Sequence, residues 1–147
     1  RVLFRSDRTF IDDAIAYMDL DDIRHQYIDN LSGGQRQRAY IAMTLAQDTD
    51  YILLDEPLNN LDMKHSVQIM QVLRKLATEL NKTVVIVIHD INFASCYSDY
   101  IVAMKNGKLV HQGEVNHIMQ SPVLQDIYDM AIPIQDIDHH KIAVYFR

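Results

Sequence analysis

The sequence predicts an α/β fold in which a mostly parallel sheet is flanked by helices. Two short apolar runs, 51–54 and 83–88, are typical of strands that are buried on both faces. The segment between them, 62–80, has a broad apolar face at helical spacing, so a strand, a helix and a second strand indicate a parallel pair. The dipeptide Asn106-Gly107 predicts a β-hairpin, which is expected to give the sheet an antiparallel edge.

Composition and charge limit the class of protein. The chain has 147 residues, of which 48% are hydrophobic and 23% are charged, and this favours a compact globular unit over a disordered segment. A formal net charge of -6 argues against general attraction to nucleic acid or to anionic lipid. The longest apolar run, 83–88, is shorter than the roughly 20 residues that cross a bilayer. Because Cys96 is the single cysteine and no secretory signal is seen, a reducing, cytosolic compartment is expected.

The first third of the chain is predicted to be helical. We expect helices over 9–20, 21–27 and 34–46. Thr9 opens a Ser/Thr-x-x-acid capping box, Asp21 and Asp22 are placed to cap the second helix, and a loop ending in a further N-cap precedes the third. The first six residues match no structural period, and we give them no role. A start at Arg1 instead of Met predicts that the chain is truncated at its N-terminus.

The rest of the chain alternates strands and helices. Asp62 is placed to cap the helix 62–80, and Asp90 is placed to cap a short helix that carries Tyr97. The later elements are expected to be strands over 100–104 and 109–111, helices near 114–120 and 122–129, and a strand over 142–146 paired with 133–137. The fold class is therefore α/β with an antiparallel hairpin region at the C-terminal end.

The octapeptide 31–38, Leu-Ser-Gly-Gly-Gln-Arg-Gln-Arg, is the first segment with a chemical signal. Gly33 and Gly34 leave backbone amides open at a helix start, which carries partial positive charge, and Ser32 adds a hydroxyl donor. Such a site suits a phosphate. Ser32 and Gln35 also have capping-box spacing, so the same residues can simply start a helix.

This octapeptide resembles the signature motif of ATP-binding cassette (ABC) ATPases. In that family each ATP lies between the P-loop of one subunit and the signature of the other, which implies that Ser32, Gly33, Gly34 and Gln35 bind nucleotide in trans. The segment 51–56 resembles the family's Walker B strand. The resemblance implies that Asp55 holds Mg²⁺ and that Glu56 polarises the attacking water or accepts its proton. Taken alone, two acids after a strand can equally cap a loop.

Two further segments follow in the family's order. The segment 58–62 lies where the family has its D-loop, which crosses the dimer interface, and Asp62 can be both a D-loop residue and an N-cap. His89 resembles the switch histidine, whose expected partner is the γ-phosphate. A lone histidine after a strand is more often structural than catalytic, so this assignment depends on order and spacing. The pair 139–140 is interpreted as a polar turn.

The P-loop pattern Gly-x-x-x-x-Gly-Lys-Ser/Thr is missing from this sequence. The glycines lie at positions 33, 34, 107 and 113, and no two are five positions apart. We therefore expect the C-terminal part of a P-loop NTPase domain of the ABC type. Residues 1–48 would be the end of the helical subdomain, and residues 49–147 would be the C-terminal part of the nucleotide-binding core. This chain alone is predicted not to hydrolyse ATP.

Two details resemble one branch of the family. The Leu-Asp-x-x-His form of 61–65, and the segment 89–94 followed by Tyr97 and Asp99, look like the ATPases of bacterial ferric-siderophore, haem and cobalamin importers. Ferric siderophores are the expected cargo. Residues 56–60, Glu-Pro-Leu-Asn-Asn, depart from the Glu-Pro-Thr-Ser form common in the family, without loss of the charged group.

The resemblance also implies cofactors, partners and a location. The parent would use ATP and Mg²⁺, would close as a homodimer of ATPase subunits, and would dock on membrane permease subunits that a substrate-binding protein serves. It would lie peripherally at the cytoplasmic face of the bacterial cell (inner) membrane and would not bind nucleic acid. Two alternatives stay open: a truncated, non-catalytic interaction module, and a soluble ABC ATPase of translation or DNA repair.

Overall fold

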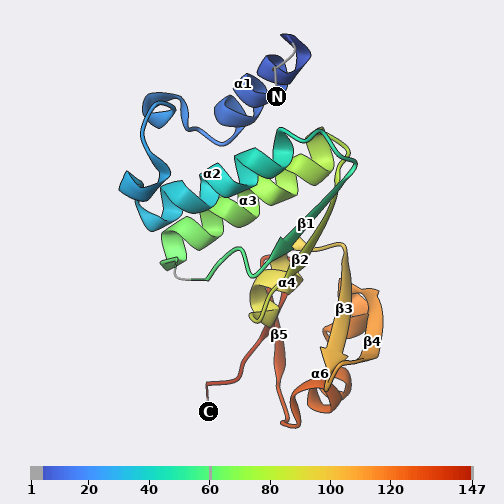
Figure 1. Cartoon of the computed structure of the whole chain (residues 1–147). Helices are drawn as coiled ribbons and strands as arrows, with labels where there is room; N and C mark the ends of the chain where they lie inside the picture. Colours follow the sequence, from blue (N-terminus) through green and yellow to red (C-terminus); the bar gives the residue numbers. More distant parts are fainter. Residues whose placement is uncertain (1–4, 60, 147) are drawn as a thin grey trace. The chain divides into compact units, whose positions relative to one another are not determined.

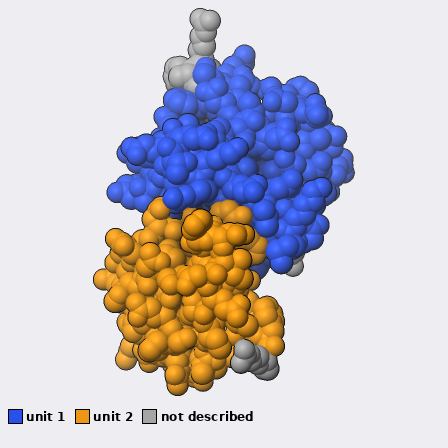
Figure 2. Space-filling model, turned by 180° about the vertical axis from the view of Figure 1, so that it is seen from behind, with its two compact units in different colours: residues 1–87 blue, residues 88–147 orange. Residues whose placement is uncertain are grey.

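The chain folds into two compact units. The structure, a computed structural model, describes residues 5–59 and 61–146 (Figure 1). One unit comprises residues 1–87 and the other residues 88–147 (Figure 2). The predicted boundary at residue 48, which separates two subdomains of the family's fold, stays a prediction. Over the described part of the chain, no helix combines the length and the apolar character needed to cross a membrane.

The first helix differs from the prediction in its extent. Helix α1 spans Arg5–Tyr17 instead of 9–20, so Thr9 lies inside the helix and is not its N-cap. The helix ends before residue 20 because Asp19 adopts the left-handed conformation, with φ of 53°. An L-residue in this conformation ends a right-handed helix.

The predicted helix over 21–27 is wrong. A single 3₁₀ turn, η1 (Asp21–Ile23), takes its place, and a second 3₁₀ turn, η2 (Ile28–Asn30), follows it. The carboxylate of Asp21 accepts a hydrogen bond from Arg24 Nη1 at 3.4 Å, and no side chain caps η1. An aspartate can cap a helix only when its oxygen faces the free amides of the first turn, and Asp21 faces Arg24 instead.

Two longer helices of the first unit agree with the prediction. Helix α2 spans Gly33–Leu45 and begins at the N-cap Ser32, and helix α3 spans Met63–Glu79 and begins at the N-cap Asp62. They run alongside each other and begin at the same end (Figure 1). Helix α1 packs on α2. The buried side chains of α2 and α3 include Ile41, Ile69, Met70, Leu73 and Leu76.

Strands β1 (Tyr51–Asp55) and β2 (Thr83–Val87) form the predicted parallel pair. Their register places Asp55 opposite Val87. The prediction that both faces are buried is wrong for this chain, because Ile52 is 1% exposed whereas its neighbour Leu53 is 70% exposed. Successive side chains of a strand point to opposite faces, so only one face of the pair is covered.

The second unit contains a short helix, two hairpins and two further helices. Its elements are α4 (Ile91–Tyr97), β3 (Tyr100–Lys105), β4 (Lys108–Glu114), α5 (Val115–Ile118), α6 (Ser121–Tyr128), β5 (Ile134–Ile137) and β6 (His140–Ala143). As predicted, Asp90 caps α4, and β3 and β4 form a hairpin in which Asn106 and Gly107 have positive φ. The core of this unit gathers Ile118, Leu124, Ile132 and Ala143.

The sheet arrangement corrects the predicted fold class. In the part of the chain that the structure describes, β1 and β2 form one parallel pair, and β3–β4 and β5–β6 form two separate antiparallel pairs. The fold is α/β, but it is not one mostly parallel sheet with an antiparallel edge. An Asn-Gly turn specifies the partner next in sequence, and it carries no information about which other strands that hairpin joins.

The C-terminal hairpin forms as predicted, but its second strand spans His140–Ala143 instead of 142–146. Strand β6 ends at Ala143, and one further bond, from Val144 N–H to the Pro133 carbonyl at 2.9 Å, extends the contact. Asp138 and His139 have positive φ and form the turn between β5 and β6. The interpretation of the pair 139–140 as a turn is therefore confirmed for His139 and wrong for His140, which is the first residue of β6 and pairs with Ile137.

Candidate functional site

The signature segment forms the start of α2. The Ser32 hydroxyl accepts a hydrogen bond from Gln35 N–H at 3.3 Å, and Gln35 Oε1 accepts one from Ser32 N–H at 3.0 Å. The capping box is therefore present. A hydroxyl that accepts one bond can still donate its own proton, and Ser32 and Gly33 are exposed. The cap thus presents an exposed helix start, which is compatible with an approaching anion.

Two arginines of the same segment hold the backbone around it. Arg36 Nη2 donates to the carbonyl oxygens of Asp29 and Leu31, each at 3.4 Å. Arg38 Nη1 donates to the carbonyls of Met18 at 3.2 Å and Asp19 at 3.3 Å, at the end of α1. Sequence reasoning missed these roles, because an acceptor on the backbone leaves no trace in residue types. The arginines fix the loop that delivers Ser32 to its capping position.

The paired acids lie at the carboxyl end of β1. Asp55 is the last residue of the strand and is exposed, whereas Glu56 is half-buried and left-handed, with φ of 47°. Glu56 N–H donates to the Val87 carbonyl at 3.1 Å, which ties the turn to β2. A non-glycine residue in this conformation is uncommon, and in this chain it also marks helix ends and turns such as Asp19 and Asn106, so at Glu56 it marks a tight turn after the strand.

Asn59 is a residue that sequence reasoning passed over at this turn. Its side-chain amide donates to Glu56 Oε2, and its backbone N–H donates to the Glu56 carbonyl at 3.1 Å. The only sequence signal was the departure of 56–60 from the family's Glu-Pro-Thr-Ser form. The asparagine therefore orients the carboxylate that the sequence singled out as a base.

The D-loop segment leads into the start of α3. Asp62 Oδ1 accepts hydrogen bonds from His65 N–H at 2.9 Å and from His65 Nδ1 at 2.7 Å. These bonds stabilise the ionised carboxylate: the backbone bond first, and then the side-chain bond, hold the pKa of Asp62 below its ordinary value.

The starts of α2 and α3 touch. A Cβ atom placed on Gly34 would lie 2.6 Å from His65 Cδ2, which no real side chain could tolerate. Signature and D-loop segments, separated by about 30 residues in sequence, are thus brought together within the first unit. Sequence analysis noted His65 only as part of the Leu-Asp-x-x-His form.

His89 belongs to the second unit. It is exposed and lies between β2 and α4, directly before the N-cap Asp90, whose carboxylate accepts from Asn92 N–H at 2.8 Å and Phe93 N–H at 3.1 Å. The Asn92 side chain also bonds both backbone groups of Ala143. The histidine therefore sits on a short, well-capped helix entry, while Ser32, Gly33, Gly34, Gln35, Asp55, Glu56 and Asp62 all lie in the first unit.

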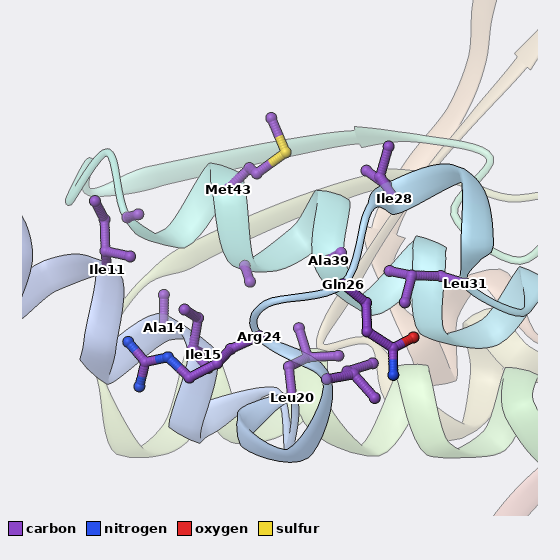
Figure 3. Close-up of a pocket in the computed structure, with 13 residues that line it drawn as sticks. Ile11, Ala14, Ile15, Leu20, Arg24, Gln26, Ile28, Leu31, Ala39 and Met43 are labelled. Carbon is purple, nitrogen blue, oxygen red and sulfur yellow. The ribbon is translucent and has the colours of Figure 1, made fainter.

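An apolar pocket of ≈ 350 Å³ lies between α1, the two 3₁₀ turns and α2 (Figure 3). Ile11 and Ile15 come from α1, Ile28 and Leu31 from the connecting segment, and Met43 from α2. Arg24 and Gln26 are its only polar lining residues among those described. With few polar groups, this pocket suits apolar contact better than catalysis.

Comparison with known proteins identifies close relatives. A family model described as "ABC transporter" matches residues 5–59. The petrobactin import ATP-binding protein YclP of Bacillus subtilis (strain 168) is 62% identical over 144 residues, which are 98% of this chain and 57% of that protein. The chain thus spans little more than half the length of this curated relative.

Solved structures show the same fold. A metal-chelate type ABC transporter in an inward-facing conformation superposes with a TM-score of 0.86 at 25% identity, over 99% of this chain and 60% of that one. The ATP-binding cassette MJ0796, dimeric and bound to ADP and Pi in a post-hydrolysis state, superposes with a TM-score of 0.66 at 34% identity, over 78% of this chain and 50% of that one.

Proposed function

Because this chain belongs to the ABC transporter family, we propose that it is the signature-bearing and Walker B part of an ATPase subunit that powers import of a ferric siderophore. The observation that carries the proposal is the joined start of α2 and α3, which puts the signature residues and the D-loop residue Asp62 on one surface of the first unit. The acids of the Walker B segment belong to the same unit. A surface that serves a nucleotide held by a second subunit needs this grouping.

The signature residues would bind the nucleotide of a second copy. Ser32 offers a hydroxyl and Gly33 a backbone amide at the exposed start of α2, and the backbone amide of the buried Gly34 would complete the donors for phosphate oxygens. Gln35 would keep this geometry through the capping box. The dimeric arrangement of the MJ0796 cassette supports a second copy of the subunit as the partner.

Glu56 would act on the attacking water. Its carboxylate is half-buried and held by the Asn59 amide, so it can polarise a water or accept its proton without first reorienting. His89 would donate to the γ-phosphate of ATP, since a histidine Nε2–H or Nδ1–H matches a phosphate oxygen. His89 would thus donate a hydrogen bond to the negatively charged phosphoryl group, and Glu56 would accept one from the attacking water.

Asp55 fits the role of a protein ligand for Mg²⁺. Asp55 is an exposed carboxylate at the end of β1, and Mg²⁺ prefers oxygen ligands, usually one or two carboxylates together with phosphates and waters. Among the residues that the structure describes, no three His, Cys, Asp or Glu side chains gather as a metal cluster. Asp55 would hold the ion together with the phosphates of ATP, where the ion would neutralise developing negative charge.

The cargo and the membrane partners follow from the relatives. The Bacillus subtilis relative is named as a petrobactin import ATP-binding protein. A ferric siderophore of this kind is the proposed cargo. Permease subunits in a bacterial inner membrane, served by a substrate-binding protein, would be the partners, with this subunit on the cytoplasmic face. The apolar pocket beside α1 and α2 lies in the segment 1–48, which we expect to face the permease.

A chimera tests the proposal. This chain replaces the matching 144 residues of the Bacillus subtilis relative, and the purified protein is assayed for ATP hydrolysis. We expect turnover in the unchanged chimera, ATP binding with almost no turnover for Glu56→Gln, and normal turnover for the control Glu114→Gln. Glutamine keeps the shape of the side chain and the bond from Asn59 but loses the base. Turnover that survives Glu56→Gln would remove the base from the mechanism.

A second variant and a growth assay separate the alternatives. Ser32→Arg puts bulk and charge at the exposed start of α2 and should prevent closure around ATP. In a strain lacking the relative, the chimera should restore growth on ferric petrobactin as the iron source. A chimera that binds permease or a second subunit but never hydrolyses ATP would instead favour the non-catalytic interaction module.

A further inference from the structure

The contact between Gly34 and His65 is tighter than ordinary packing. Gly34 is buried at the start of α2, and a Cβ atom there would lie 2.6 Å from Cδ2, 3.0 Å from Cγ and 3.2 Å from Nε2 of the His65 ring. Its φ lies outside the left-handed range, so the backbone conformation does not demand glycine. Space does: the ring of His65 occupies the place where a side chain at position 34 would stand.

The His65 ring is also fixed from its other side. Nδ1 lies 2.7 Å from Asp62 Oδ1, and the backbone N–H of His65 donates to the same oxygen at 2.9 Å. An ionised carboxylate only accepts hydrogen bonds, so Nδ1 carries the proton. The ring is therefore held between the carboxylate of the D-loop and the backbone of the signature segment.

We propose that His65 is a positioning residue for the signature motif: its ring, oriented by Asp62, seats on Gly34 and fixes the start of α2 to the start of α3. This inference rests on the proposed function, because it concerns how the nucleotide-facing residues are held. Movement of the D-loop against a second subunit would pass to Ser32 and Gly33 through the ring. Closure around ATP would then require both helix starts to move as one body.

A double-mutant cycle on the full 147-residue chain tests the contact without reference to ATP. Gly34→Ala should lower the urea midpoint when His65 is present, because the added methyl group meets the ring. In the His65→Ala background, the same substitution should leave the midpoint unchanged or raise it, since alanine is the better helix former. A Gly34→Ala chain that folds only together with His65→Ala shows the same coupling.

The positioning role needs a second readout, taken in the chimera with Glu56→Gln to prevent turnover. His65→Ala should raise the ATP concentration for half-maximal dimerisation by about tenfold, a coupling of ordinary size. Binding of a fluorescent ATP analogue to the monomer should stay unchanged, because the monomer holds ATP through its own P-loop. The matched control is His117→Ala in the second unit. A Cβ atom placed on Gly113 would lie 3.1 Å from His117 Cδ2, so this variant also removes a histidine ring that lies close to a glycine.

The outcomes separate the two proposals. An equal cost of Gly34→Ala with and without His65 would mean that the ring is not seated on the glycine, and the inference would be overturned. Coupling in the cycle together with unchanged dimerisation would make the contact structural only, which also overturns the positioning role. If the unchanged chimera hydrolyses no ATP, the proposed function fails, while the cycle still reports on the contact.

Discussion

Replacement of Asn92 by alanine should loosen the C-terminal hairpin from α4. Asn92 Nδ2 donates to the Ala143 carbonyl at 3.1 Å, and Asn92 Oδ1 accepts from Ala143 N–H at 2.7 Å. The amide thus satisfies both backbone groups of one residue of β6. Ala143 is only 1% exposed, so water can replace the lost side chain only in part.

The expected cost can be worked from these two bonds. A buried donor or acceptor left without a partner costs about 1–3 kcal/mol, and Asn92→Ala leaves one of each. Asn92 itself is half-buried, so some water reaches the vacated space and the lower part of the range applies. We expect a loss of about 2–4 kcal/mol in the free energy of unfolding. The bond from Ser95 Oγ to the Lys141 carbonyl, at 2.6 Å, still ties α4 to the hairpin.

Urea denaturation and amide hydrogen exchange together test this expectation. Asn92→Ala should lower the urea midpoint and speed exchange across β5 and β6, whereas Gln125→Ala, on the exposed side of α6, should change neither. Asn92→Asp should also destabilise the fold, because it keeps the acceptor for Ala143 N–H but sets a carboxylate oxygen against the Ala143 carbonyl. A cost for Asn92→Ala no larger than that of the Gln125 control would refute the reasoning.

Three smaller predictions concern the first unit. Ser32→Ala should lower the free energy of unfolding by about 1 kcal/mol and Ser32→Gly by only a few tenths, measured by urea denaturation, because the cap on Gln35 N–H is lost; equal costs would argue against the cap. The pKa of Asp62 is lowered, so its ionised form stabilises the fold above the ordinary carboxyl range, and this contribution is lost as the pH falls through the depressed pKa. The urea midpoint of Asp62→Asn should thus lie below that of wild type at neutral pH and converge with it in acid. Burial and the hydrogen bond to Glu79 raise the pKa of Tyr17 to about 12, so its contribution is present below pH 10 and is lost as the pH rises toward 12. Tyr17→Phe should flatten that alkaline loss and remove a phenolate that appears near pH 12 in an absorbance titration.

The local elements were predictable because their signals are local. Asp62 and Asp90 were placed as N-caps from sequence alone, and both accept from amides of the first helical turn. The hairpin at Asn106 followed from its turn chemistry. The prediction that Thr9 is an N-cap was wrong, because a capping-box pattern also occurs inside helices. Nothing in the pattern shows that helical residues precede it.

The tertiary contacts of the candidate site were not predictable in the same way. The glycine at position 34 was interpreted as an open approach for phosphate, and only the fold shows that the His65 ring fills that side of it. Asn59 was noted as a departure from a family pattern, and its bond to Glu56 depends on a left-handed turn that no propensity scale specifies. Both contacts arise from backbone geometry, which residue types do not encode.

The arginines that follow the signature glycines have a consequence for how such motifs are interpreted in any chain. Arg36 binds backbone carbonyls of the preceding loop, and Arg38 binds those of the two residues that follow α1. Selection for folding alone would therefore preserve them in a duplicate subunit that had lost its chemistry. A match to the arginines therefore reports architecture, whereas the proposed turnover depends on Glu56 and His89. Decaying copies of such a subunit should thus lose the acid and the histidine first and the arginines last.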